Sequence, residues 1–282
     1  SAARTLAKHG AKVVVLEAQT IGWGASSRNG GMALTGLKVG MATVIKKYGR
    51  ELAKTLFQYS LDAVGTVEQI IKEENINCGF ARHGHLLTAN KPKHYEALKD
   101  EVEFMAREFN HKVRLVPPDE LKSEIGSNIY HGGLLDEVSG GLNPAQFVAG
   151  LAGAAEKAGA MLCARARVNR LRRGENRFVI ETERGSLTAE TVFVATSGYK
   201  GNVTKKLQRK IIPIGSFIIA TERLSDELAR ELSPKNRMIF DYKHYLNYFR
   251  LWDNRMIFGG RAGFFPETAN TIKRSADILR RE

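Results

Sequence analysis

The chain is 282 residues long, which predicts about two domains at roughly 100–200 residues each. Its 43% hydrophobic and 26% charged residues, with 27 Gly and 7 Pro, exclude collagen, a disulfide miniprotein and a disordered chain. The net charge of +13 favours anionic partners. Because the basic residues are spread along the chain and are not interleaved with aromatics, we interpret them as a solubilising surface and expect no nucleic-acid partner.

The cysteines and histidines predict neither a disulfide framework nor a metal site. Cys78 and Cys163 lie far apart and form no CxxC motif. His83 and His85 have the spacing of a metal pair on one strand face, but no third ligand is nearby in the sequence, so we interpret them as structural. No apolar run reaches the ~18 residues of a membrane span, and no signal peptide opens the chain. We therefore expect a protein of the reducing cytoplasm.

The first residues predict half of a nucleotide-binding unit. Residues 1–10 have the spacing of a helix that ends at Gly10, and the Val-rich run 13–16 predicts a parallel strand buried on both faces. Glu17 follows this strand directly. A helix, a glycine and a strand that ends in an acid form the second half of a Rossmann βαβ unit, in which the acid accepts hydrogen bonds from a ribose. The alternative is an exposed acid at a strand end.

The first half of such a unit, a strand with a GxGxxG turn, does not occur in the sequence. At the other end, residues 271–282 predict an amphipathic helix at which the sequence stops without a cap. We therefore expect the chain to be an internal piece of a longer protein, or a protein that lacks both ends.

A glycine-rich segment follows the first strand. Residues 21–32, IGWGASSRNGGM, contain four glycines, two serines and an asparagine. This composition predicts a tight loop whose backbone comes close to another group. Backbone N–H groups in such a loop suit a phosphate or an electron-rich ring. A plain surface loop is the alternative that composition does not exclude.

The motif Glu17-Ala18, a short gap and Gly-x-Gly-Ala-Ser-x-Arg-Asn-Gly-Gly resembles the D-amino-acid oxidase and glycine oxidase superfamily of flavoenzymes. It looks most like the branch that contains gamma-glutamylputrescine oxidase. The resemblance implies non-covalent FAD, with Glu17 on the ribose, Ser26–Asn29 around the pyrophosphate and flavin, and Gly30–Met32 beside the isoalloxazine. The residues that it assigns to FAD are Glu17, Ala18, Ser26, Ser27, Arg28, Asn29, Gly30, Gly31, Met32, Val168, Ala195, Thr196, Ser197 and Gly198.

Three later segments extend the resemblance in the expected order. The turn 136–144, DEVSGGLNP, leads into an Ala-rich helix at 145–157 that ends at Gly159. The strand 164–168 resembles the one whose backbone near Val168 pairs with adenine, and a hairpin at 178–182 and 185–189 follows. Residues 191–199, TVFVATSGY, predict a buried strand that ends in small residues, against which a dinucleotide packs.

We expect an α/β fold in which a Rossmann-like FAD-binding domain is interleaved with a mixed-sheet α+β substrate domain. The expected FAD-binding domain comprises residues 1–78, 145–204 and 259–282, and the substrate domain comprises residues 79–144 and 205–258. Within the substrate domain, the sequence predicts a strand at 85–89, a helix at 93–109, and a hairpin of 247–251 with 255–261 that turns at Asp253-Asn254.

Three residues of this hairpin are the candidates for contact with substrate. Tyr248 and Arg250 share one strand face, and the alternative is that Tyr248 packs in the sheet and Arg250 faces solvent. Arg261 follows Gly259-Gly260, which permit close approach to the flavin, and it is a candidate partner of a carboxylate or of the flavin. Because guanidinium grips carboxylate in a bidentate way, Arg261 and Arg250 are candidates to hold an acidic substrate group.

The resemblance implies an FAD-dependent oxidase or dehydrogenase that acts on the C–N bond of a small amine or amino acid. In the family, hydride passes from the substrate carbon to flavin N5, the imine hydrolyses, and electrons pass to O2 or another acceptor. We expect a small amine that bears a carboxylate. The alternatives are a flavin-binding module that modifies tRNA or serves as a non-catalytic subunit, and an inactive fragment without FAD. No Ser–His–Asp order or carboxylate pair predicts a hydrolase.

Overall fold

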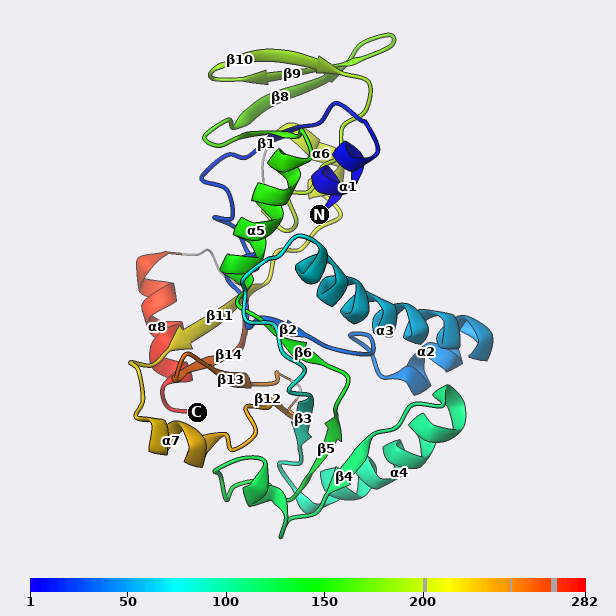
Figure 1. The fold of residues 1–282 in the computed structure, drawn as a ribbon, viewed down its shortest axis with the longest axis vertical. Helices are drawn as coiled ribbons and strands as arrows, with labels where there is room; N and C mark the ends of the chain where they lie inside the picture. Colours follow the sequence, from blue (N-terminus) through cyan, green and yellow to red (C-terminus); the bar gives the residue numbers. More distant parts are fainter. Residues whose placement is uncertain (200–201, 244, 265–267) are drawn as a thin grey trace. The chain divides into compact units, whose positions relative to one another are not determined.

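The computed structural model describes residues 1–199, 202–243, 245–264 and 268–282 and has the expected mixed α/β architecture (Figure 1). The chain forms two compact units. Unit 1 comprises residues 1–27, 148–215 and 263–266, and unit 2 comprises residues 28–147, 216–262 and 267–282. Residues 28–78, which the sequence analysis assigns to the FAD-binding domain, cluster with unit 2, and the boundaries of the functional domains stay a prediction.

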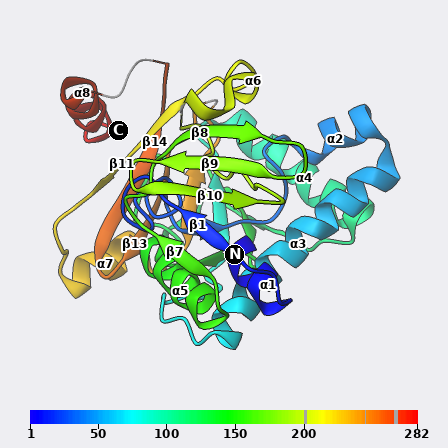
Figure 2. The ribbon, with the colours of Figure 1, turned by 90° about the horizontal axis from the view of Figure 1, so that it is seen from above.

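Unit 1 is built on a short parallel strand pair and a three-stranded antiparallel sheet. Its elements are α1 (Ala2–Lys8), β1 (Val14–Leu16), the part of α5 (Pro144–Lys157) from residue 148 on, β7 (Met161–Cys163), β8 (Val168–Arg173), β9 (Phe178–Thr182), β10 (Gly185–Ala189), η2 (Asn202–Thr204) and α6 (Lys205–Gln208). In Figure 2, β8, β9 and β10 lie side by side, in the order β10-β9-β8.

The beginning of unit 1 folds as the sequence predicts. Gly10 adopts a φ of +82° directly after α1, a backbone conformation that favours glycine and ends the helix. β1 then pairs with β7 in parallel, with Val14 opposite Met161 and Leu16 opposite Cys163. The buried Ala7 of α1 packs with alanines of α5 and of the turn after it. Val13, just before β1, and Leu162 of β7 pack against the same small core.

Two strand predictions in unit 1 are wrong. Residues 191–196 are not in a strand, and the side chain of Phe193 is 74% exposed. A strand needs a hydrogen-bonded neighbour, and in the described structure residues 191–196 pair with neither edge of the two-stranded β1-β7 sheet. Val14, predicted to be buried, is exposed, because the face of β1 that carries it is left partly uncovered. The strand predicted at 164–168 begins at Val168 instead, after a turn with Arg165 at a φ of +53°.

Unit 2 is built on a seven-stranded sheet with the order β11-β14-β13-β12-β3-β5-β4 and a separate pair, β2-β6. Its elements are β2 (Met32–Ala33), α2 (Met41–Tyr48), α3 (Arg50–Glu73), β3 (His85–Thr88), α4 (Pro92–Phe109), β4 (Arg114–Val116), η1 (Leu121–Ser123), β5 (Gly133–Asp136), β6 (Gly140–Gly141), β11 (Gly215–Ala220), α7 (Asp226–Leu232), β12 (Met238–Asp241), β13 (Tyr248–Trp252), β14 (Arg255–Gly263) and α8 (Ala269–Leu279). The predicted helix at 93–109 is confirmed by α4.

The hairpin of β13 and β14 turns where the sequence predicts. Asp253 and Asn254 adopt φ angles of +49° and +54°, the conformation of a two-residue turn whose twist matches that of the strands. This turn sets the register, in which Tyr248 lies opposite Gly259 and Arg250 opposite Ile257. Tyr248 and Arg250 therefore lie on the same face of β13.

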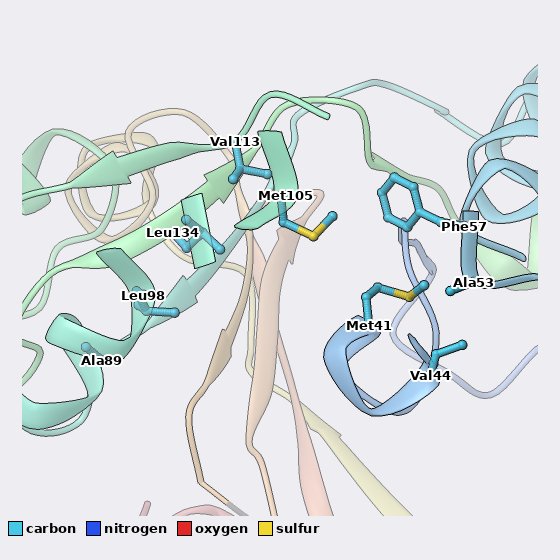
Figure 3. Close-up of a cluster of buried hydrophobic side chains, with 9 residues drawn as sticks. All are labelled: Met41, Val44, Ala53, Phe57, Ala89, Leu98, Met105, Val113 and Leu134. Carbon is cyan, nitrogen blue, oxygen red and sulfur yellow. The ribbon is translucent and has the colours of Figure 1, made fainter. Parts of the chain in front are cut away.

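The main core of unit 2 lies between the sheet and the helices α2, α3 and α4 (Figure 3). Phe57 of α3 and Met41 of α2 face Met105 of α4 across this core. The amphipathic spacing of α4 buries Leu98 and Met105 on one face of the helix. None of the helices in the described parts of the chain is long and apolar enough to cross a membrane.

Candidate active site

Glu17 lies directly after β1, where the neighbouring chain bends around it. Its backbone N–H donates to the carbonyl of Cys163 at 2.9 Å, and its carbonyl accepts from Ala166 N–H at 2.8 Å. The carboxylate Oε1 accepts from the N–H of Gln19 at 2.8 Å. Oε2 has no hydrogen-bond partner among the described residues, so one carboxylate oxygen of this half-buried side chain is free for a ligand.

The predicted adenine side of the site adjoins Glu17. The turn at 164–166 is tied to the end of β1, because Arg165 N–H also donates to the carbonyl of Gln19 at 2.7 Å. Val168 begins β8 two residues later. Unit 1 therefore brings Glu17, Ala18 and the backbone near Val168 together at the carboxyl end of a parallel strand pair, the edge at which α/β sheets bind their ligands.

The first half of the glycine-rich loop packs against the turn at 196–199. Trp23 and Tyr199 have ring centroids 5.8 Å apart, and a Cβ on Gly24 would lie 3.3 Å from the Tyr199 ring. The turn closes through a hydrogen bond from Tyr199 N–H to the Thr196 carbonyl, with Ser197 at a φ of +50°. Ala195 through Gly198 do not end a strand as predicted, and the contact of this turn with the loop is made by Tyr199, the residue after them.

The second half of the loop, residues 28–32, belongs to unit 2 and is held by its own contacts. The Asn29 side chain accepts from Gly31 N–H at 2.9 Å, and Leu142 N–H donates to the Gly31 carbonyl at 2.8 Å. Gly31 has a φ of +64°, and a Cβ there would lie 2.0 Å from the Leu142 oxygen. Both facts require glycine, because another side chain would be strained in φ and would collide with backbone.

The face of β13 that carries Tyr248 and Arg250 packs on this loop. A Cβ on Gly30 would lie 3.0 Å from the Tyr248 ring, and one on Gly259 would lie 2.3 Å from it. The room that Gly259 leaves is thus occupied by Tyr248. Arg250 is 5% exposed, and it donates from Nη1 to the Gly31 carbonyl at 2.8 Å. Burial lowers the pKa of Arg250 to about 10, which leaves the guanidinium charged at neutral pH.

Arg261, the third candidate, lies in β14. Its side chain is outside the described part of the structure, so its role rests on its place in the sequence. Gly260 just before it is crowded, because a Cβ there would lie 2.5 Å from the Asn247 side-chain oxygen. Both glycines before Arg261 therefore serve packing within the β13–β14 region, in addition to any approach of a ligand.

A buried polar network that sequence reasoning missed holds the segment after β2. Asp136 accepts from Thr35 Oγ1 at 2.6 Å and bonds with His111 Nε2 at 2.7 Å. Ser139 Oγ accepts from Thr35 N–H at 3.2 Å and bonds with His85 Nδ1 at 2.7 Å. The pairing of β3 with β5 places His85 opposite Asp136. The only signals for this network in the sequence are a polar residue at the start of one apolar strand, His85 of β3, and another at the end of a second, Asp136 of β5.

The pKa values of this network give a stability prediction. Burial lowers the pKa of His85 to about 4, so between about pH 6.5 and 4 the unfolded chain binds the proton that the folded chain refuses. Stability should fall as pH is lowered through this range. Burial acts to raise the pKa of Asp136, but hydrogen bonds from His111 and Thr35 outweigh it and hold the pKa at about 2. A second loss should therefore follow between about pH 4 and pH 2.

Urea unfolding at several pH values measures both losses. Trp23→Phe leaves Trp252 as the one tryptophan, so its fluorescence reports on unit 2 alone. In His85→Gln, the free energy of unfolding should fall less steeply between pH 6.5 and 4, by up to ~1.4 kcal/mol per pH unit. The further loss of stability below pH 4, which comes from Asp136, should remain. The exposed His9 of unit 1 provides the control, His9→Gln. An unchanged slope in the His85 variant would contradict the assignment.

The described residues contain no group of three or more His, Cys, Asp or Glu side chains placed to hold a metal ion. His85 stacks on Phe240 with ring centroids 5.1 Å apart and bonds with Ser139. His83 lies 3.3 Å from the side-chain nitrogen of Asn236. Each of the two histidines thus has a packing or hydrogen-bonding role in the protein.

The fold is shared with solved structures of amino-acid oxidoreductases. Solved structures with a similar fold include glycine oxidase from Geobacillus kaustophilus, with a TM-score of 0.69 and 19% identity over 98% of this chain and 74% of that one. L-proline dehydrogenase from P. horikoshii has a TM-score of 0.70 and 17% identity, covering 99% of this chain and 72% of that one. At these identities the likeness concerns the fold.

Sequence comparison establishes the family. The family model "FAD dependent oxidoreductase" matches residues 1–281, and the chain belongs to this family. It is 33% identical to gamma-glutamylputrescine oxidoreductase of Escherichia coli over 97% of this chain and 64% of that protein. It is also 33% identical to a probable oxidoreductase, OrdL, of Haemophilus influenzae, over 92% of this chain and 61% of that protein. The chain thus spans less than two thirds of the length of these relatives.

The residues present fit part of an FAD site. The free Glu17 oxygen at the strand end suits a ribose hydroxyl. The glycine-rich loop that follows it in the sequence packs at Gly24 against Tyr199. In unit 2 the backbone at Gly30 and Gly31 is held in one conformation. The GxGxxG turn that binds the pyrophosphate is not in this sequence, so the residues present account for the ribose, the adenine side and the loop.

Proposed function

We propose that the protein containing this chain oxidises the C–N bond of a small amine or amino acid with FAD as the electron acceptor. The observation that carries the proposal is the arrangement in unit 1, where Glu17 and its free oxygen lie at the carboxyl end of β1 beside residues 164–168. These are the segments that the family resemblance assigns to the nucleotide. Membership of the oxidoreductase family favours this function over a tRNA-modifying or non-catalytic flavin module.

The residues of this chain would bind and orient the cofactor and the substrate, and the cofactor would carry the redox chemistry. When bound, FAD would supply a two-electron acceptor for the hydride that leaves the substrate carbon. Glu17 would hold the ribose, the backbone near Val168 the adenine, and Ser26 through Asn29 the pyrophosphate and flavin. Gly30, Gly31 and Met32 would run beside the ring. Fixed orientation and exclusion of water are the contributions expected of the protein, which agrees with a sequence that offers no obvious general base.

The substrate class that we propose is an amine that bears a carboxylate. Gamma-glutamylputrescine, after which the E. coli relative is named, is such a molecule. Tyr248 would close the site beside the reacting carbon, and Arg261 would grip the acid in a bidentate way. The electrons leave to O2 or another acceptor. The thiols of Cys78 and Cys163 are free, which supports a place in the reducing cytoplasm.

Arg261→Ala tests the substrate class. We expect the KM for a carboxylated amine to rise by about 10-fold or more, because a charge-assisted bidentate contact is worth roughly 1.5–3 kcal/mol, while the KM for the matching plain amine changes little. Loss of uniform binding leaves kcat nearly constant. Arg255→Ala is the matched control, since Arg255 is exposed on the same strand and bonds to the Thr221 carbonyl. Equal losses on both amines would assign Arg261 to the flavin or to the fold.

Trapping the product tests the reaction class. Oxidation of a C–N bond gives an imine that hydrolyses to a carbonyl compound and an amine or ammonia. The full-length protein, incubated with an amine and air or an artificial electron acceptor, should yield a carbonyl that a hydrazine reagent captures. A flavin module that acts on tRNA would yield none, and it would bind tRNA with an affinity that falls steeply as salt is raised.

A further inference from the structure

Arg250 is a buried cation that faces no anion in the described residues. Its side chain lies on β13 and is 5% exposed, yet no carboxylate among the described residues is within ion-pair distance of it. Its hydrogen bond runs from Nη1 to the Gly31 carbonyl, and its Cζ lies 5.3 Å from the centre of the Trp252 ring. Burying a charge that no opposite charge compensates destabilises the folded protein. The buried guanidinium is therefore expected to have a function that explains its presence.

The guanidinium occupies space that a glycine leaves for it. A Cβ on Gly141 would lie 2.3 Å from Nη1 of Arg250, so Gly141 in β6 admits the side chain to the Gly31 carbonyl. That carbonyl also accepts from Leu142 N–H at 2.8 Å, and Asn29 holds Gly31 N–H. Both polar groups of Gly31 are thus bonded, and one of these bonds comes from a strand more than 200 residues away in the sequence.

The same contacts favour a backbone role for Arg250 over the substrate role that its sequence predicts. A substrate-binding arginine presents two donors to a carboxylate on an open face, whereas here Nη1 is bonded to a peptide carbonyl and the whole residue is 5% exposed. Tyr248, on the same strand face, packs on Gly30, so the two side chains contact successive residues of one loop. A cation bonded to the carbonyl restricts the peptide that carries it.

We propose that Arg250 is a positioning residue, whose guanidinium fixes the Gly31 carbonyl and with it the course of the Gly30–Gly31 backbone. This inference rests on the proposed function only in placing that backbone beside the flavin. Arg250 then acts on the reaction through the loop, and its removal should affect every substrate alike.

Hydrogen exchange of the chain itself tests the contact without any cofactor. In Arg250→Met, the amides of Gly31 and Leu142 should exchange at least 10-fold faster than in the unchanged chain, while amides of the central β3–β12 pair keep their rates. Arg250→Lys retains the charge and should restore part of the protection. Arg255→Met is the matched control, because Arg255 also donates to a carbonyl but from an exposed position. Unchanged exchange at Gly31 and Leu142 would overturn the inference.

Kinetics of the flavin-loaded, full-length protein separate the two roles. For a positioning residue, Arg250→Met should lower kcat about equally for a carboxylated and a plain amine, leave KM within about twofold, and alter the visible circular dichroism of the bound flavin before substrate is added. A KM that rises for the carboxylated amine alone would overturn the inference and assign Arg250 to the substrate. If the unchanged protein holds no flavin, the proposed function fails, and the exchange result still decides whether Arg250 fixes the loop.

Discussion

Gly31→Ala should destabilise unit 2 by more than ~3 kcal/mol and abolish flavin loading in the full-length protein. Two costs add at this position. Alanine at a φ of +64° is strained by roughly 1 kcal/mol, and its Cβ would lie 2.0 Å from the Leu142 carbonyl oxygen. Because that neighbour is backbone in a paired segment, relief requires β2 and β6 to move apart, which is an overpacking cost of a further few kcal/mol. Urea unfolding followed by Trp252 fluorescence measures the sum.

Gly36→Ala isolates the first of these costs. Gly36 has a φ of +79° and no atom within 4 Å of the position of a Cβ, so this variant should lose only about 1 kcal/mol. It should also load flavin normally. If Gly31→Ala lost no more stability than Gly36→Ala, or loaded flavin to the same extent, the packing of residues 28–32 described above would be wrong.

Glu17→Ala should weaken FAD binding by the full-length protein about 10- to 150-fold. A hydrogen bond between a carboxylate and a ribose hydroxyl is worth roughly 1.5–3 kcal/mol, and the free Glu17 oxygen is placed to make it. Glu17→Gln should lose less, because its amide oxygen still accepts a hydrogen bond but carries no charge. Titration of the apoprotein with FAD, followed by flavin fluorescence, measures these dissociation constants.

Glu175→Gln is the control for charge alone. Glu175 is an exposed acid between β8 and β9 in unit 1, and its loss should leave FAD affinity within about twofold. Folding of each variant is checked by its urea midpoint. Equal affinities for the unchanged protein and Glu17→Ala would remove Glu17 from the cofactor site and leave it as an exposed acid at a strand end.

Local patterns predict much of this fold because their causes are local. The spacing of apolar residues in α4, the Asp253-Asn254 turn, and Gly10 after α1 each set the backbone conformation of a few neighbouring residues. The helix predicted after Asn143-Pro144 likewise forms, and the Asn143 side chain accepts from the N–H of Ala145 and Gln146 at its start. For these elements no distant part of the chain is needed.

The failures involve partners that are distant in the sequence. Residues 191–196 have the composition of a buried strand, but a strand forms only where a sheet edge receives it. The network of Thr35, Asp136 and His111 joins residues from remote parts of the chain, and no spacing rule links them. The site residues divide in the same way. Glu17 follows from the pattern of one strand, whereas the bond of Arg250 to Gly31 depends on how two remote segments pack.

The most direct test of the proposed function is an anaerobic titration of the purified full-length protein with a carboxylated amine, followed by visible absorption. We expect the protein to carry the flavin bands without added FAD, to lose them on addition of the amine, and to regain them when an electron acceptor is admitted. Acid precipitation should leave the colour in the supernatant. A colourless protein, or a bound flavin that no amine bleaches, would contradict the assignment of this chain to an FAD-dependent amine oxidoreductase.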